Sequence, residues 1–240
     1  MTSFKVIQKI TTIHTNLGAI RGIRVVSRGG AMKLYDCTTA PSPRRVRVFL
    51  AEKGISVPTV QVDLRSGEQF TPAFRAINPD CTVPVLELDH GTMITDILAI
   101  CRYFEELYPD PPLMGRSAEE RAVIASWLRR IEWDGFYVAM DVFRNSTPGF
   151  KGRAIPGPDP YEQIPALAER GRARIQHFFA WLDAGLADNE FICGPRFTVA
   201  DISGMVAIDF SGWAKLKAPE HMTHFRRWHA AVSARPSAKA

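Results

Sequence analysis

The sequence predicts two domains: an α/β domain and, after it, a domain made only of helices. Between residues 32 and 109, short apolar segments typical of strands alternate with helical patterns in the order βαβαββα. From residue 116 to residue 236, the periodic segments show only the spacing of helices. A proline-rich stretch, residues 108–115, lies between the two patterns and marks the domain boundary.

The α/β domain opens with a βαβ pattern. Residues 32–36 read as its first strand, and Ser42-Pro43 then begins a helix, with serine as N-cap and proline at the first helical position. The helix ends at Gly54, which fits a glycine C-cap. Residues 57–62 are the second strand, parallel to the first, and residues 69–77 form a short, irregular helix.

Residues 78–100 complete the first domain with the sequence NPDCTVPVLELDHGTMITDILAI. A short apolar strand begins at Val83-Pro84, because the first position of a strand tolerates the missing N–H of proline. Gly91 supplies the positive φ that a tight hairpin needs. Thr95 or Asp96 can then cap the helix that follows.

The second domain contains two capping boxes, at Ser117/Glu120 and at Thr198/Asp201. The first box opens a long helix that is expected to run to about Asn145. A loop rich in proline and glycine follows it. We expect the loop at residues 147–161 and further helices at residues 162–187, from residue 198 onward and at 219–234.

The charge distribution argues against a nucleic-acid-binding protein. The chain carries 30 basic and 25 acidic residues, but five basic residues and no acidic ones lie in residues 1–31. The remainder is therefore neutral, whereas a nucleic-acid footprint needs basic residues gathered on the folded body. Residues 1–31 fit no element of the domain and are expected to be a poorly ordered leader. They read either as a transit peptide or as the result of a mis-assigned start, with Met32 as the true one.

Composition also predicts where the protein is located and whether it binds a metal. No stretch approaches the roughly 18 apolar residues of a membrane span, so we expect a soluble, cytoplasmic protein without membrane contacts. The four cysteines form no C-x-x-C pair and the six histidines form no metal-spaced group, which predicts no metal and no dithiol motif. Cys81 is expected to be a passive loop cysteine, with a mixed-disulfide role as the alternative.

The segment from Asn78 to Ile100 resembles the second half of a thioredoxin-like domain, and in detail it resembles the glutathione S-transferase family. In that family, the pattern N-P-x-x-x-V-P-x-L holds a cis-proline, and the residue before it pairs its main chain with the cysteine of glutathione. The resemblance extends over nearly all of residues 32–236. It implies a thioredoxin-like βαβαββα domain that binds glutathione as co-substrate, an all-helical domain that holds an electrophile pocket, and a homodimer.

The group that contacts the glutathione sulphur is the least regular part of the pattern. Free thiols ionise near ~8.5, so donors or a helix N-terminus must stabilise the thiolate at neutral pH. Aligned on residues 45–50, the family's usual catalytic serine falls at Ala40, which has no hydroxyl. The nearest hydroxyls belong to Thr39 and to Ser42, which also reads as the helix N-cap. Backbone N–H groups and an ordered water are further alternatives.

The resemblance also implies residues that bind the rest of glutathione. Gln69 falls where relatives hold the glycyl carboxylate, although a solvated polar residue is the alternative reading. Val83 and Pro84 would recognise the peptide by β-type pairing. Asp96 can receive the ligand's ammonium, or only cap its helix. Ile97 replaces the family's serine and offers only its N–H, a loss of ~0.5–1.5 kcal/mol, or up to about tenfold in affinity.

The electrophile pocket is expected between the domains, against the first long helix of the second domain. Five residues near the end of that helix are candidates, and periodicity does not separate pocket lining from core. They are Phe136, Tyr137, Met140, Phe143 and Arg144.

These residues favour a glutathione transferase that directs the thiolate onto a small hydrophobic electrophile. A glutathione-dependent lyase, isomerase or reductase is the first alternative, because the fold does not fix the reaction. A non-catalytic binding or scaffold protein is the second. Ala40 and Ile97 favour the scaffold, whereas Gln69, Val83-Pro84 and Asp96 oppose it.

Overall fold

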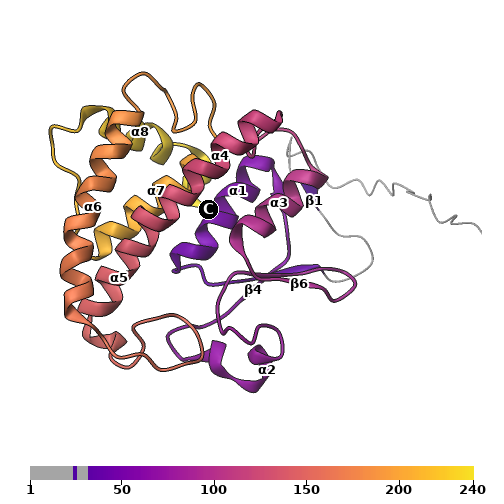
Figure 1. Ribbon diagram of the computed structural model, residues 1–240. Helices are drawn as coiled ribbons and strands as arrows, with labels where there is room; N and C mark the ends of the chain where they lie inside the picture. The colour runs from indigo at the N-terminus through magenta and orange to yellow at the C-terminus, as the bar shows by residue number, and fades with distance from the viewer. Residues whose placement is uncertain (1–23, 26–31) are drawn as a thin grey trace, which may run out of the picture.

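The computed structural model describes residues 24–25 and 32–240, and it shows a small α/β unit beside a larger group of helices (Figure 1). The expected leader, residues 1–31, lies outside the described residues except for the short strand β1 (Arg24–Val25). This strand pairs in parallel with β3 (Ile55–Ser56). The other strands form a second sheet.

That second sheet has four strands in the order β4-β2-β5-β6. Its centre is β2 (Lys33–Asp36), which runs parallel to β4 (Thr59–Gln61) and antiparallel to β5 (Val85–Glu87). The edge strand β6 (Met93–Ile94) follows the turn at Gly91, whose φ is 86° as the hairpin requires. The predicted order of strands and helices in this domain is confirmed.

Helices cover both faces of the sheet. On one face lie α1 (Pro41–Lys53) and α3 (Ile97–Leu107), and on the other lie η1 (Glu68–Phe70) and α2 (Pro72–Arg75) (Figure 1). Side chains of β2 alternate accordingly. Leu34 belongs to the large core cluster with α1 and α3, and its neighbour Tyr35 belongs to a small cluster with Phe74 of α2.

The start of α1 differs from the prediction. The N-cap is Ala40, in an extended conformation without a side-chain cap, so the prediction that Ser42 caps this helix is wrong. Two prolines compete for the first helical position, and Pro41 takes it instead of Pro43. Two other predicted caps of this domain hold: Gly54 is left-handed with φ 63°, and Asp96 rather than Thr95 caps α3.

The second domain is mostly helical, as predicted, and its regular elements are all helices. The expected long helix is present as α4 (Ala118–Arg130), the π-helical segment η2 (Ile131–Phe136) and α5 (Tyr137–Ser146), which follow one another without a break. The predicted capping box of Thr198 and Asp201 is present. Ser117 caps α4 by accepting from the N–H of Glu120, but Glu120 accepts from the N–H of Arg116 rather than from that of Ser117, so the predicted box there is only half formed. The remaining elements are η3 (Pro148–Phe150), α6 (Pro165–Gly185), α7 (Val199–Trp213), α8 (Thr223–Ser233) and η4 (Pro236–Lys239).

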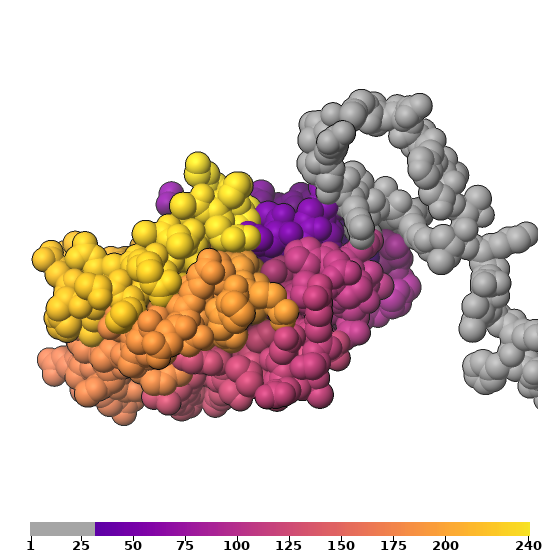
Figure 2. All heavy atoms as spheres, turned by 90° about the horizontal axis from the view of Figure 1, so that it is seen from above, coloured from indigo at the N-terminus to yellow at the C-terminus, as the bar shows by residue number. Residues whose placement is uncertain are grey.

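Helix α1 joins the two domains. It packs against α7 and against η4 at the end of the chain, and one core cluster extends from the sheet into the helical domain. In the view from above, the yellow C-terminal segment lies against the indigo first helix (Figure 2). Arg235 donates two hydrogen bonds to Glu52 there, at 2.8 and 2.7 Å. Helix α1 is thus held by contacts with both domains.

Candidate functional site

Two segments with predicted site residues meet at the same end of the four-stranded sheet. Because β5 runs antiparallel to β2 with Tyr35 opposite Val85, Val83-Pro84 lies beyond β5 where the loop 37–40 leaves β2. Cys37 and Val83 belong to the same buried cluster, and Ala40 packs against it. The loop before α1 and the segment before β5 therefore lie next to each other at this end of the sheet.

The turn that precedes β5 is built around Asn78, which is 1% exposed. Its side-chain nitrogen donates to the carbonyl of Thr82 at 2.9 Å, and its side-chain oxygen accepts from the N–H of Asp80 at 3.1 Å. Between them, Cys81 has a positive φ of 54° and its buried thiol donates to the carbonyl of Pro79. A left-handed backbone is the conformation that favours glycine, so the cysteine occupies a turn position rather than an open surface.

The Val83-Pro84 peptide bond is cis, as the resemblance implies. Val83 is 8% exposed, and its N–H and carbonyl have no hydrogen-bond partner among the described residues. Buried main-chain groups are normally paired. An extended peptide that lies alongside Val83 could pair with both its N–H and its carbonyl.

The start of α1 offers few donors. Pro41 and Pro43 have no N–H, so Ser42 alone among the first three helical residues can donate from its main chain. Within the described chain, neither the N–H nor the hydroxyl of Ser42 has a partner. Thr39 is exposed, and its hydroxyl lies 3.5 Å from the sulphur of Cys37. Both predicted hydroxyls thus lie next to Ala40, with that of Ser42 free of a capping role.

The predicted contacts for the two ends of glutathione lie in η1 and at the start of α3, two elements on opposite faces of the sheet (Figure 1). Gln69 is 4% exposed, and its Oε1 has no hydrogen-bond partner among the described residues, so it is not the solvated residue of the alternative reading. Asp96 is exposed and uses Oδ1 to cap α3 through the N–H of Ala99 at 2.8 Å. Ile97 is the first residue of that helix, where N–H groups lack helical partners.

The five candidates for the electrophile pocket lie in different surroundings. Phe136 is 6% exposed and packs against Phe210 at a centroid distance of 5.2 Å. Phe143 also contacts Phe210, while Met140 is half-buried against the core cluster. Tyr137, by contrast, is 44% exposed.

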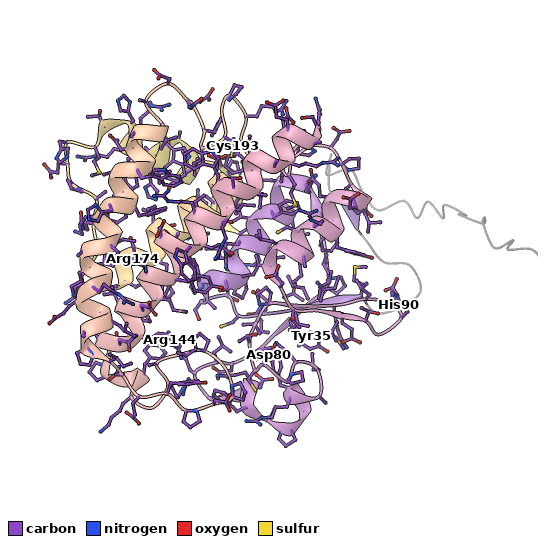
Figure 3. The ribbon with its side chains drawn as sticks, viewed as in Figure 1. Tyr35, Asp80, His90, Arg144, Arg174 and Cys193 are labelled. Carbon is purple, nitrogen blue, oxygen red and sulfur yellow. The ribbon has the colours of Figure 1, made fainter. Side chains whose placement is uncertain are left out.

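Arg144 fastens the loop that follows α5. Its Nε donates to the carbonyl of Ala154 at 3.2 Å and its Nη2 to that of Arg153. Burial and the nearby Arg153 lower the pKa of Arg144 to about 10. The loop then reaches the α/β domain, where the guanidinium of Arg153 lies 5.4 Å from the ring of Phe70, beside Gln69. Figure 3 labels Arg144 beside this loop and Asp80 across from it.

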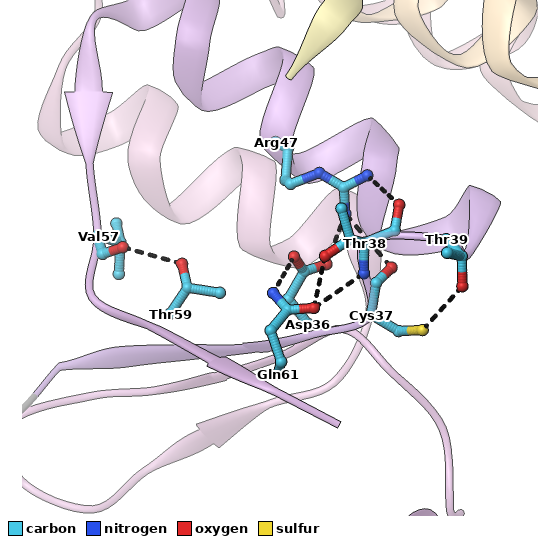
Figure 4. A network of polar contacts seen from close by, with 8 residues as sticks. All are labelled: Asp36, Cys37, Thr38, Thr39, Arg47, Val57, Thr59 and Gln61. Carbon is cyan, nitrogen blue, oxygen red and sulfur yellow. Dashed lines mark hydrogen bonds and ion pairs between the residues drawn. The ribbon is translucent and has the colours of Figure 1, made fainter. Parts of the chain in front are cut away.

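Three residues of the site were missed at the sequence level: Asp36, Arg47 and Gln61 (Figure 4). Asp36 ends β2 and is 1% exposed, which is unusual for a carboxylate. Arg47 donates to its Oδ1 at 2.6 Å and Gln61 to its Oδ2 at 2.9 Å. A carboxylate directly after the buried pair Leu34-Tyr35, at the carboxyl end of the strand, is the signal that could have indicated them.

The described part of the chain contains no cluster of three metal-ligating side chains. Within that same part, no helix is both long and apolar enough to cross a membrane.

Comparisons with known proteins agree with this geometry. A family model described as "Glutathione S-transferase, N-terminal domain" matches residues 39–107, and one described as "Glutathione S-transferase, C-terminal domain" matches residues 165–203. Glutathione S-transferase 2 of Saccharomyces cerevisiae is 34% identical over 226 residues, which cover 91% of this chain and 94% of that protein.

Two further relatives bear on the fold and on the reaction. The crystal structure of a glutathione S-transferase domain-containing protein from Marinobacter aquaeolei is 42% identical with a TM-score of 0.76, and the match covers 86% of this chain and 99% of that one. Maleylacetoacetate isomerase of Pseudomonas aeruginosa is 41% identical over 100 residues, which are 39% of this chain and 47% of that protein.

Proposed function

Because the chain belongs to the glutathione S-transferase family, we propose that it binds glutathione and conjugates its sulphur to a small hydrophobic electrophile. The observation that carries the proposal is the unpaired main chain of Val83, at the end of the sheet where the loop before α1 also lies. The main chain of the glutathione cysteine would pair with this N–H and carbonyl. Its thiol would then lie toward Ala40 and the start of α1.

The two ends of glutathione would bind on either side of this contact. The second carboxylate oxygen of Asp96 has no hydrogen bond within the described residues, so it can accept the γ-glutamyl ammonium. The N–H groups at the start of α3 suit the adjacent carboxylate. The side-chain nitrogen Nε2 of Gln69 would donate to the glycyl carboxylate, whereas its buried Oε1, which has no partner in the described chain, can only accept from an N–H group.

The chemical step is an attack by the thiolate sulphur on an electrophilic carbon. The thiol proton leaves first, and the sulphur then supplies both electrons of the new S–C bond, while the electrophile releases its leaving group or accepts a proton. Donors near the sulphur lower the thiol pKa. Ala40 supplies none from its side chain, so the hydroxyls of Ser42 and Thr39, their main-chain N–H groups, or a bound water would serve.

The proposal is tested by titrating the full chain with reduced glutathione in a calorimeter while the ultraviolet absorbance of the thiolate is followed across pH. The expected result is binding at millimolar strength or better, with the pKa of the bound thiol below its free value of ~8.5. Binding without a lowered thiol pKa would point to a scaffold. The absence of binding would reject the transferase.

A glutathione-dependent isomerase or lyase is the second candidate, favoured by the match to maleylacetoacetate isomerase. The two reactions differ in their thiol balance, because a transferase consumes glutathione whereas an isomerase regenerates it. Counting free thiols before and after turnover with a panel of electrophiles and cis-enones therefore distinguishes them.

The proposal also covers the location, the oligomeric state and the domain roles of the enzyme. We propose a cytoplasmic homodimer that detoxifies electrophiles, with residues 32–109 as the glutathione-binding domain and residues 116–236 carrying the electrophile pocket. Phe136, Tyr137, Met140, Phe143 and Arg144 remain the pocket candidates. Sedimentation equilibrium of the full chain tests the dimer, and a monomer at micromolar concentration would reject it.

A further inference from the structure

We propose that Arg47 and Gln61 are positioning residues, which hold the loop 37–40 so that its free donors face the glutathione sulphur. The inference rests on the proposed function and deepens it. Neither residue is expected to contact glutathione. Each acts through the main chain of the loop.

The first step is that the three polar side chains form one unit. Asp36 is buried at the end of β2, and both of its carboxylate oxygens are used, one by Arg47 at 2.6 Å and the other by Gln61 at 2.9 Å. The residues come from a strand, a helix and a neighbouring strand, and Gln61 lies opposite Asp36 in the parallel pair. The buried carboxylate therefore orients both partners.

The second step is that both partners form further hydrogen bonds with the same residue, Thr38. Arg47 donates from Nη2 to the carbonyl of Thr38 at 3.0 Å. Gln61 accepts at Oε1 from the N–H of Thr38 at 3.0 Å and from its hydroxyl at 2.6 Å. Figure 4 shows these bonds converging on the loop. Thr38 is thus fixed through its N–H, its carbonyl and its side chain.

The third step is that packing does not hold this part of the loop. Thr38 and Thr39 are both exposed, so no buried apolar side chain fixes their backbone. The N–H of Ala40 is also occupied, because it donates to the carbonyl of Cys37 at 2.9 Å. In the described chain, the N–H groups of Thr39 and Ser42 are the main-chain donors that stay free around Ala40.

The consequence follows from the missing hydroxyl at position 40. A thiolate that cannot rely on a serine there depends on main-chain N–H groups and on the hydroxyls of Thr39 and Ser42. The direction of these donors is set by the loop backbone, and hydrogen bonds weaken steeply when they are misaligned. The Asp36–Arg47–Gln61 unit therefore orients the loop donors toward the sulphur, in place of the serine hydroxyl that is missing at position 40.

The test uses Gln61→Ala and Arg47→Lys in the full chain. Gln61→Ala removes the two bonds between Gln61 and Thr38 and the bond from Gln61 to Asp36, but it leaves the ion pair of Asp36 with Arg47. Arg47→Lys keeps the charge, but an ammonium lacks the planar fork that reaches Asp36 and Thr38 together. For each variant, the thiolate absorbance of bound glutathione is followed across pH, and the Kd is measured by calorimetry.

We expect the pKa of the bound thiol to rise by about one, which lowers the thiolate fraction about tenfold at pH values well below that pKa. The Kd should change less than about threefold, because the proposed glutathione contacts lie elsewhere. A residue that only stabilised the fold would lower the Tm and leave the thiol pKa unchanged. Arg235→Lys is the matched control, since it weakens an arginine–carboxylate pair at the other end of α1.

Each outcome decides a different claim. If the unmodified chain lowers the thiol pKa and both variants retain that low value, the positioning role is overturned while the proposed function stands. If the unmodified chain binds glutathione without lowering its thiol pKa, both fail. Should Arg47→Lys not fold, Gln61→Ala still decides, because its side chain lies on an exposed edge strand.

Discussion

The guanidinium carbon of Arg45 lies 4.3 Å from the centroid of the Phe136 ring, and its Nη1 donates to Glu132 at 2.7 Å. Arg45 belongs to α1 of the first domain, whereas both partners belong to the π-helical segment η2 of the second. Because Arg45 is only 3% exposed, this contact is buried between the domains. The stability of the two domains should therefore be coupled through it.

We expect Arg45→Ala to lower the free energy of unfolding by about 3 kcal/mol, because it breaks a buried ion pair and a cation–π contact. Urea denaturation measures the change. Arg116→Ala is the control, since its pair with Asp110 is exposed and should contribute less than ~0.5 kcal/mol. Equal effects of the two substitutions would show that the domains are not coupled through Arg45.

Ser42→Ala separates a role in folding from a role at the sulphur. Since Ser42 does not cap α1, the free energy of unfolding should change by less than ~0.5 kcal/mol, whereas loss of a capping serine would cost ~1 kcal/mol. If its hydroxyl donates to the thiolate, kcat/KM should fall about tenfold or more. Unchanged kinetics in both Ser42→Ala and Thr39→Ala would assign the contact to main-chain N–H groups or to water.

Ile97→Ser should restore the hydroxyl that the family places at the γ-glutamyl subsite. We expect glutathione to bind more tightly, by up to about tenfold, because one hydrogen bond contributes ~0.5–1.5 kcal/mol. Calorimetry gives the Kd directly. Leu98→Ser, one position further along α3, is the control, and an equal gain there would mean that the effect is not specific to this subsite.

The pair of Glu52 and Arg235 predicts a pH dependence in the acid range. Burial acts to raise the pKa of Glu52, but hydrogen bonds from Arg235 and Ser237 outweigh it and hold the pKa below the ordinary value of 4.5. A lowered carboxyl pKa stabilises the folded state above the unfolded-state pKa, and this contribution disappears as pH falls through the folded-state pKa. Thermal unfolding of Glu52→Gln should thus show a deficit at pH 7.

The size of that deficit is expected to be about 2 kcal/mol at pH 7, the range for hydrogen bonds to a charged group. It should be complete above pH 4.5 and should close progressively below it. A deficit that stays constant from pH 7 to pH 3 would mean that packing, rather than the charge of Glu52, is responsible.

Local signals in the sequence predicted the elements well. Gly54 ends α1, Asp96 caps α3, and Thr198 and Asp201 form the capping box of α7. Each of these features depends on residues within a few positions of one another. For that reason they can be predicted without knowledge of the tertiary structure.

The parts that escaped prediction depend on contacts between distant residues. Asp36 and Gln61 meet because two strands are parallel neighbours, a register that no local pattern records. The start of α1 was misplaced because Pro41 and Pro43 are equally good first residues of a helix. The surroundings of Gln69 likewise depend on the loop from the second domain, whose Arg153 reaches the neighbouring Phe70.

The π-helical segment η2 interrupts what would otherwise be one uniform helix. A π-type turn closes its hydrogen bond one residue later than an α-type turn, so the helical wheel of α5 is out of phase with that of α4. Relative to an uninterrupted α-helix, the side chains of α5 are rotated by about 100° around the helix axis. The continuous helix can thus contact the first domain with one face, through Glu132 and Phe136, and pack against α6 with a different face.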